Sequence, residues 1–368
     1  MRMKRYIQLI IGMLLGVAVS ACDVHEFPEY DYLEFDLELK YDTAMPLFES
    51  GSGEVTLKTR AELAELSKQA AEYRVRYIIE AYRTNLDGSY DSEEEAYIKV
   101  VKYEDNIVFD ADGRNINLDK TFTLHMVPGN FTFVIWTDYI KKGTESDLYY
   151  DTGDFGEIKT RRPHSGSNDF RDAFRGEVFT NIGYENLQAS ATLTRPFGKF
   201  NIISTDLQEF ITRVIQMRLD RNLLPEKPAD GPEETRAVNL EDFTVKFIYD
   251  GSIPYTYNVK RNFPADINWG FIVEFESTIE RINDEEVELG FDYVMVNPKG
   301  SEVKLGLEVY DYDNTLVSSV NPFPIKLMPS MLTTKRGEFL TSKAVGGVGI
   351  KPGFNEDPDG EFNYVVPD

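Results

Sequence analysis

The alternation of hydrophobic and polar residues predicts a chain built mainly of β-strands. A strand buried on one face shows a period of two, and a strand buried on both faces shows a short continuous apolar run. In the first half of the sequence such patterns occupy residues 32–39, 73–83, 96–102, 106–109, 121–126, 131–137 and 187–205. In the second half they occupy residues 243–249, 271–277, 290–296, 303–310, 321–327 and 361–366. Short strands at such spacing are typical of sandwiches and barrels and not of βαβ units.

Two segments depart from the strand pattern. Residues 59–72 are rich in Ala, Leu and Glu at near-helical spacing, and residues 207–223 form a second helical segment. Residues 138–184 are rich in Gly, Asp and Arg, which predicts long surface loops. The sequence Val127-Pro128-Gly129-Asn130 predicts a turn between strands, because Pro and Gly suit its second and third positions. The predicted fold class is therefore all-β with short helical insertions.

The N-terminus has the pattern of a bacterial lipoprotein leader. Arg2, Lys4 and Arg5 precede an apolar run over residues 6–19, which is too short for a membrane span of about 20 residues. Val19-Ser20-Ala21-Cys22 then matches a lipobox, where the cysteine thiol forms a thioether to lipid. We predict a signal peptide over 1–21, a lipid on Cys22 and an acidic tether over 22–30. The alternative is an ordinary secretory signal followed by an unrelated free cysteine.

Composition narrows the classes of partner. The net charge is −24, and removing the leader takes away three positive charges, so no basic surface remains to bind DNA or RNA. The acidity also opposes lying flat on an anionic membrane, so attachment is expected through the lipid. Cys22 is the only cysteine, which excludes an internal disulfide. The core must therefore hold the fold, with 42% hydrophobic and 13% aromatic residues.

The sequence carries no motif of a known catalytic or metal site. The three histidines, His25, His125 and His164, have no zinc-ligand spacing. Neither a Gly-x-Ser-x-Gly elbow nor a Gly-rich phosphate loop is present. We therefore predict a protein that is not an enzyme and has no cofactor and no metal. A secreted hydrolase, which is a third interpretation, has no support among the motifs.

Three segments have two interpretations each. Residues 311–314 and 357–360 are Asp-rich and suit either calcium or a hairpin turn, of which the turn is favoured. Residues 169–176 mix phenylalanine with alternating charge. They suit either a recognition loop or a helical turn in which Phe170 and Phe174 pack on the sandwich while the charges pair, and we favour the turn.

The order of three motifs resembles the fimbrillin-type proteins of Bacteroidales, which include pilus subunits and lipid-linked anchor and accessory proteins. The motifs are residues 127–136, 194–202 with Gly198 in place of the usual Ala, and the Gly-rich residues 346–352. The start of the mature chain at Cys22 and residues 169–176 resemble an uncharacterised family of Bacteroidales lipoproteins. The resemblance implies two transthyretin-like β-sandwich domains, over 31–195 and 196–368.

The resemblance also implies a mode of assembly, strand donation, in which one subunit lends an edge strand to its neighbour. The candidate donor strands are residues 33–39 and 362–366. For 362–366 we favour the alternative that the strand completes the sheet of its own domain. In polymerising subunits a protease cuts after an arginine, and Arg60-Ala61 is a candidate site. We favour the alternative that Arg60 is an ordinary solvated helix residue.

We therefore expect a lipid-anchored protein of the outer membrane and the cell surface, with a fimbrial accessory, fimbrial anchor or adhesion role. Asp23, Glu26 and Glu29 after the lipidated cysteine loosely resemble export signals to the cell surface. The alternative is a surface glycan-binding lipoprotein, which needs exposed aromatic side chains in a row. Trp136 lies in a core-like strand, so Trp269 is the candidate ligand platform.

Overall fold

The computed structural model describes residues 32–48, 60–90, 95–110, 115–221, 238–251, 253–264 and 273–342. Within these ranges the chain forms many strands and two α-helices, α2 (Arg60–Ala70) and α3 (Leu207–Asp220). The all-β fold class is therefore confirmed. No helix in the described ranges is both long enough and apolar enough to cross a bilayer.

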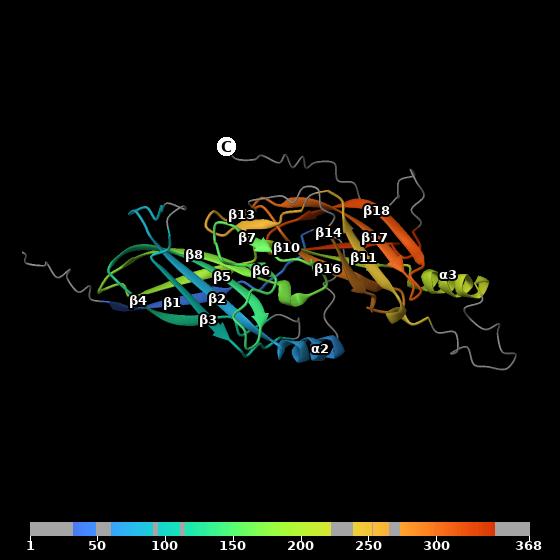
Figure 1. Cartoon of the computed structure of the whole chain (residues 1–368), viewed down its shortest axis with the longest axis horizontal. Coiled ribbons are helices and arrows are strands. Elements are labelled where there is room, and N and C mark those ends of the chain that lie inside the picture. The colour runs from blue at the N-terminus through green and yellow to red at the C-terminus, as the bar shows by residue number, and fades with distance from the viewer. Residues whose placement is uncertain are drawn as a thin grey trace, which may run out of the picture.

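The first sandwich is one seven-stranded sheet folded over on itself (Figure 1). Its order is β3-β2-β5-β8-β9-β1-β4. The bounds are β1 (Leu33–Tyr41), β2 (Tyr73–Arg83), β3 (Ile98–Glu104), β4 (Lys120–Met126), β5 (Gly129–Lys141), β8 (Phe174–Ile182) and β9 (Gln188–Thr194). Phe35 of β1 stacks on Phe133 of β5 with ring centres 5.4 Å apart, although the two strands are not neighbours in the sheet. The two ends of the sheet therefore face each other across a shared core.

Three expectations about this sandwich are corrected. The segment 33–39 is a candidate donor strand by sequence, but β1 pairs with β4 on one side and with β9 on the other. Its two rows of backbone groups are both used, so it has no edge to donate. Residues 106–109 form no strand, and only an isolated bridge joins Phe109 to Asn115. In place of a four-residue turn at 127–130, only Val127 and Pro128 separate β4 from β5, and Gly129 and Asn130 already belong to β5. Strands β4 and β5 do not pair with each other.

The second sandwich consists of two four-stranded sheets around a second core. One sheet has the order β15-β16-β10-β19 and the other β14-β11-β17-β18. The bounds are β10 (Phe197–Ser204), β11 (Thr244–Tyr249), β14 (Val273–Thr278), β15 (Glu280–Arg281), β16 (Val287–Met295), β17 (Ser301–Tyr310), β18 (Leu316–Leu327) and β19 (Leu332–Gly337). Helix α3 packs Phe210 and Val214 into this core. Strand β19 was not predicted, because Thr-Thr-Lys-Arg-Gly lacks an apolar pattern.

A small third sheet and an apolar cluster join the two sandwiches. The sheet has the order β13-β12-β7-β6, and Thr256 of β12 pairs with Lys159 of β7. The bounds are β6 (Tyr150–Asp151), β7 (Ile158–Thr160), β12 (Thr256–Asn258) and β13 (Phe263–Pro264). We call the cluster the junction. Its residues are Ile78, Tyr82, Val134, Trp136, Tyr150, Phe155, Ile158, Ala173, Phe197, Tyr257, Val259, Phe291, Tyr293 and Met295.

The junction explains why the sequences of β2 and β5 are nearly continuous apolar runs. In β2, Tyr77 and Ile79 point into the first core, while Ile78 points into the junction. In β5, Phe133 points into the first core and Trp136 points into the junction. A strand covered on both faces has no polar side, so alternation disappears. The predicted burial of Trp136 is confirmed, since its side chain is fully buried.

The expectation of long surface loops over 138–184 is wrong. The segment contains the end of β5, the strands β6, β7 and β8 and a 3-10 helix, η1 (Asp169–Arg171). Tyr150, Phe155 and Ile158 are buried in the junction. In the sequence each of these apolar residues is isolated among Gly and Asp, because together they fill an irregular space between two sandwiches. Such packing leaves no period in the sequence.

We keep the predicted domain boundary near Arg195 as a proposal. Strand β9 of the first sandwich ends at Thr194, and β10 of the second begins at Phe197. The pairing of β7 with β12 and the bridge from Leu47 to Leu332 both cross that boundary. We expect the two halves to depend on each other even though each has its own core.

Gly198, which replaces an alanine of the resembling motif, has a packing reason. A Cβ at this position would lie 2.8 Å from Leu327 Cβ and 3.0 Å from the carbonyl oxygen of Met328. Leu327 is the last residue of β18 and Met328 follows it, and the contact with Met328 is to backbone, so neither can move cheaply. The close approach of β10 to β18 therefore requires glycine.

We predict that Gly198→Ala lowers the free energy of unfolding by about 1–3 kcal/mol, the usual cost of overpacking. Urea unfolding followed by circular dichroism measures the change. Gly183→Ala is the matched control, because a Cβ there meets nothing within 4 Å. If Gly198→Ala were as stable as Gly183→Ala, the close approach of β10 and β18 would be wrong.

Candidate functional site

The short helix η1 is held between the two sandwiches. The Asn168 side chain accepts a hydrogen bond from the backbone N–H of Phe170 at 2.9 Å and so caps the turn. Phe170 stacks on Tyr73 with ring centres 3.9 Å apart, inside the first core. With the phenylalanine turned inward, the charged neighbours on either side face the second sandwich.

Each charge of this segment has a partner. Lys199 Nζ of β10 lies 3.0 Å from Asp169 Oδ1. Arg171 Nη1 lies 2.5 Å from Asp292 Oδ1 of β16. Asp172 is 2.8 Å from Arg195 Nε in the connection between the sandwiches. The favoured interpretation, in which Phe170 and Phe174 pack while the charges pair, is confirmed, although the helical turn ends at Arg171 and Phe174 begins β8.

Asp292 is the centre of this polar group. Its carboxylate is fully buried and contacts Arg171, His164 Nε2 at 2.6 Å and the Tyr249 hydroxyl at 2.6 Å. It also accepts a hydrogen bond from the backbone N–H of Tyr293 at 2.8 Å. A buried carboxylate without partners would be very costly, and here Arg171, the Tyr249 hydroxyl and the Tyr293 N–H all donate to it, as does His164 Nε2 when that nitrogen is protonated.

The surroundings of Asp292 decide its protonation. Burial alone would raise the pKa of Asp292, but the charges of His164 and Arg171 and the hydrogen bonds from His164 and Tyr249 outweigh burial and leave this pKa below its ordinary value. Burial raises the pKa of the Tyr249 phenol well above its ordinary value, so the phenol stays protonated and donates to Asp292. Burial also raises the pKa of Asp172, against the opposing charge of Arg195.

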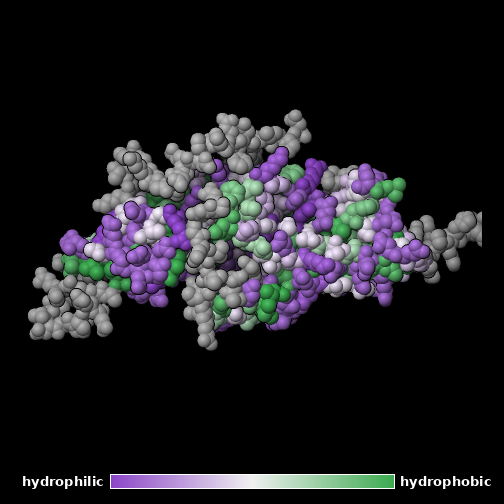
Figure 2. Space-filling view, turned by 180° about the vertical axis from the view of Figure 1, so that it is seen from behind, coloured by the Kyte–Doolittle hydropathy of each residue, from purple (hydrophilic) through white to green (hydrophobic). Residues whose placement is uncertain are grey.

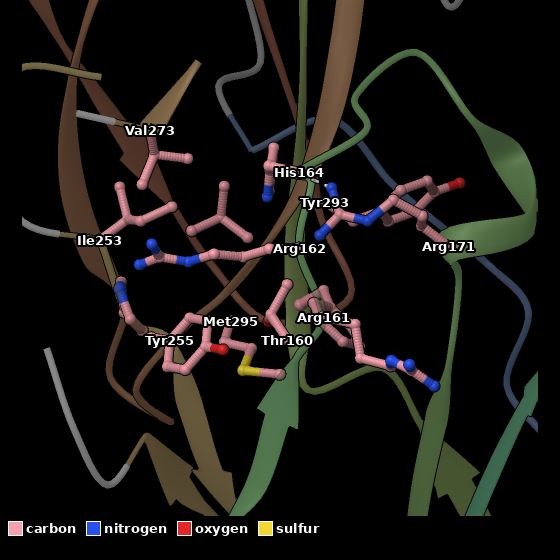
Figure 3. Close-up of a pocket in the computed structure, with 13 residues that line it drawn as sticks. Thr160, Arg161, Arg162, His164, Arg171, Ile253, Tyr255, Val273, Tyr293 and Met295 are labelled. Atoms are coloured by element: carbon pink, nitrogen blue, oxygen red, sulfur yellow. Dashed lines mark hydrogen bonds between the residues drawn. The ribbon is translucent and has the colours of Figure 1, made fainter. Parts of the chain in front are cut away.

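A small cavity opens beside this group (Figure 3). Its volume is about 30 Å³, and its wall includes His164, Arg171 and Tyr293. Figure 3 shows Arg162 reaching between Ile253 and Tyr255, while Arg161 extends the other way. The Arg162 guanidinium lies 5.4 Å from the centre of the Tyr255 ring. Such a space holds one or two water molecules and is far below the roughly 300 Å³ of a small-molecule site.

The other sequence candidates lie apart from this group. His125 is exposed on β4, away from His164. Asp311 closes the turn between β17 and β18 and pairs with Arg218 at 2.5 Å, so residues 311–314 form the favoured hairpin turn. Across the described ranges no group of three or more His, Cys, Asp or Glu side chains is placed to hold a metal.

Several predicted features lie outside the described residues. These are Cys22, the tether 22–30, His25, Trp269, the Gly-rich residues 346–352, the segment 357–360 and the C-terminal strand 361–366. Helix α2 begins at Arg60, as the helical interpretation of that residue requires.

Sequence reasoning did not find Asp292, the central residue. A signal was present, since Asp292 is the one charged residue in the run Gly-Phe-Asp-Tyr-Val-Met-Val. A carboxylate within an apolar strand requires a buried partner, but its partners Arg171 and His164 lie more than 100 residues earlier. The sequence alone therefore marks the charge and does not identify its partners.

The fold and this polar group define the class of protein. It is an all-β protein of two sandwiches joined by a buried ionic contact. A family model described as a family of unknown function (DUF6562) matches residues 33–367, so the chain belongs to that family. The expected membership in an uncharacterised family is thereby confirmed. No curated protein matches the chain.

Solved structures with detectable similarity include several proteins of Bacteroidales. The fimbrial anchor protein Mfa2 from Porphyromonas gingivalis is 9% identical with a TM-score of 0.34, over 78% of this chain and 82% of that one. A candidate adhesin from Bacteroides ovatus is 11% identical with a TM-score of 0.35, over 79% and 76%. A candidate polysaccharide-binding protein (DUF1812) from Bacteroides thetaiotaomicron is 9% identical with a TM-score of 0.38, over 78% and 80%.

We predict that Asp292→Asn lowers the free energy of unfolding at pH 7 by about 3–5 kcal/mol, because Arg171 stays buried without its counter-charge. Urea unfolding measures the change. Glu274→Gln is the control, since it also removes one partner of an ion pair, with Lys246, but at the surface. We expect that variant to stay close to the wild type.

The pH dependence of this difference has a definite sign. The pKa of Asp292 is lower in the folded than in the unfolded protein, so its contribution is complete above the unfolded pKa of about 3.9. The contribution is lost as the pH falls through the lower, folded value. The gap between wild type and Asp292→Asn should therefore narrow in acid. A gap that keeps its size would contradict the assignment.

Proposed function

We propose that this is a lipid-anchored protein of the bacterial outer membrane and cell surface, without enzymatic activity, that serves as a fimbrial accessory or anchor protein or as an adhesin. The observation that carries the proposal is the position of the only cysteine, Cys22, at the end of a basic and apolar leader. The first strand begins at Leu33, so the tether 22–30 directly precedes the fold and links it to the lipid.

The arrangement of the two sandwiches supports such a role. Strand β1 begins at one end of the long axis, and α3 lies at the other end (Figure 1). A chain anchored through the tether would hold the second sandwich away from the membrane. The junction and the buried ion pairs beside it hold the two sandwiches together, which suits a protein that presents one end to a partner.

The rival function, glycan binding, has less support. Among the residues that the structure describes, the large exposed aromatic side chains are Tyr32, Tyr97, Phe179, Tyr184 and Tyr312. Tyr312 lies apart from the others, in the turn between β17 and β18. The other four lie toward one end of the first sandwich, where the Arg83 guanidinium lies over the Tyr97 ring. The cavity beside His164 is smaller than a sugar ring. Trp269 remains the candidate ligand platform for glycan binding.

Strand donation to fimbrial subunits is the proposed mode of assembly. Among the described edge strands, β18 contains Pro322 and Pro324, and β14 presents Glu274 and Glu276 at its exposed face. Proline and charge at an edge oppose pairing with another chain. With β1 enclosed, the C-terminal segment 362–366 is the remaining candidate donor.

We predict that Cys22→Ala releases the protein from the membrane fraction into the soluble fraction, because no thiol is left to carry lipid. Detergent phase partitioning of cell extracts measures this. Ser20→Ala is the matched control, since it alters the same motif but keeps the thiol. If Cys22→Ala partitioned with the detergent as the wild type does, the lipid anchor would be wrong.

If the C-terminal segment donates a strand, deleting residues 361–368 abolishes binding to fimbrial subunits and leaves the fold intact. Pull-down with purified fimbriae measures binding, and circular dichroism measures the fold. Global unfolding would show that the segment completes its own domain. Binding that survives in a folded protein would exclude this segment as the donor strand.

A further inference from the structure

Exposed apolar side chains gather at one end of the first sandwich, which we call the tip. They are Tyr32 with 64% exposed, Leu86 with 86%, Phe179 with 42%, Tyr184 with 69% and Leu187 with 39%. Figure 2 shows hydrophobic residues at the surface of the first sandwich, on the right of that view, among hydrophilic ones. Exposed apolar residues are ordinary when they stand singly, but a group of them at one place marks a contact surface.

Strand register places these residues together. Asp36 of β1 is level with Gln188 of β9, and the two strands run parallel. Tyr32 precedes β1 and Tyr184 lies in the turn before β9, so both project beyond the same end of the sheet. Leu187 is also held there, because its carbonyl accepts a hydrogen bond from the N–H of Asp36 at 2.8 Å.

The loop after β2 completes the tip. Arg83, the last residue of β2, pairs with Phe131 at the start of β5, and Thr132 pairs with Phe179 of β8. The Thr132 hydroxyl donates to the carbonyl of Gly88 at 3.1 Å, which holds the loop beside Phe179. Leu86 lies in the turn of this loop and is the most exposed of the five residues.

The tip is also the end of the fold that lies nearest to Cys22 along the chain. Ten peptide units separate Cys22 from Tyr32, and fully extended they span at most about 33–36 Å. The 13-residue strand β5 alone is longer, about 44 Å at 3.4 Å per residue. A lipid on Cys22 would therefore keep the tip closer to the bilayer than the far end of the same sandwich.

The polar residues of the tip favour the interfacial layer of a bilayer over electrostatic adsorption. Glu34, Asp87 and Glu185 are exposed there beside the basic Arg83. An acidic surface is not attracted to anionic headgroups. Tyrosine, in contrast, prefers the boundary between headgroups and acyl chains, where its ring is apolar and its hydroxyl stays wet.

We propose that the tip inserts its tyrosine and leucine side chains into the interfacial layer of the membrane that holds the lipid anchor. This rests on the proposed lipidation of Cys22. The tip supplies a second contact and also sets an orientation, with the first sandwich end-on to the bilayer and the second sandwich facing away.

The test uses the acylated full-length protein in vesicles of phosphatidylethanolamine and phosphatidylglycerol. Acylation consumes the only native thiol, so Leu86→Cys provides a unique site for a nitroxide label. Ile116→Cys is the matched control. Ile116 is 62% exposed and precedes β4, whose first residue, Lys120, pairs with Leu39 near the opposite end of β1.

We predict that the label at residue 86 collides less with a water-soluble nickel chelate and more with oxygen than the label at 116. Tyr184→Cys should behave like Leu86→Cys, which guards against a local effect of one substitution. Labels at 86 and 184 as open to the nickel chelate as the label at 116 would overturn the membrane contact.

The proposed anchor is tested separately with the wild-type protein and a maleimide. If Cys22 reacts, it is not acylated, and both the anchor and the membrane contact that rests on it are overturned. If Cys22 is blocked while residues 86 and 184 remain in water, the anchor holds and only the membrane contact is overturned.

Discussion

The structure depends on one buried carboxylate, Asp292, and on the cation that reaches it from the other sandwich. Moving a charge out of water is so costly that Arg171 and Asp292 are stable between the sandwiches only as a pair. Arg171 belongs to the turn that packs Phe170 into the first core. The pair therefore links the position of that turn to the presence of β16. Apolar side chains of the junction also join the two sandwiches, whereas the ion pair requires one particular charged group from each sandwich to meet.

Local patterns predicted those parts of the fold whose neighbours are regular. Strand β2 occupies residues 73–83 as predicted, and helix α2 lies within the expected 59–72. In both elements, each face has the same kind of surroundings along its whole length, so the residue pattern is regular. The prediction for 138–184 is wrong because the buried residues of this region fill a space shaped by two separate sandwiches. Strand β19 was missed because it pairs in parallel with β10 through backbone groups, and its side chains are polar.

The sequence predicted one side of the candidate site and not the other. The unusual mixture of Phe170, Phe174 and charges marked residues 169–176, and the packing of both rings follows from their sequence. The partner carboxylate lies on a strand formed more than 100 residues later. The topology of both sandwiches decides which charged residues pair, and the local sequence does not contain that information. The fold class also leaves function open, since similar sandwiches serve unrelated tasks. The role proposed for this chain comes from its leader and its tip.

The enclosure of β1 has a mechanical consequence. Tension applied through the tether enters at Leu33, and tension from a partner on the second sandwich leaves the first sandwich at Thr194, the last residue of β9. Because β1 and β9 are parallel and paired from Asp36 to Tyr41, these two pulls act at opposite ends of adjacent strands. The load is a shear that all the hydrogen bonds of the ladder resist together, and not a peeling force that opens them one after another. The chain enters its fold in the geometry that best withstands being pulled.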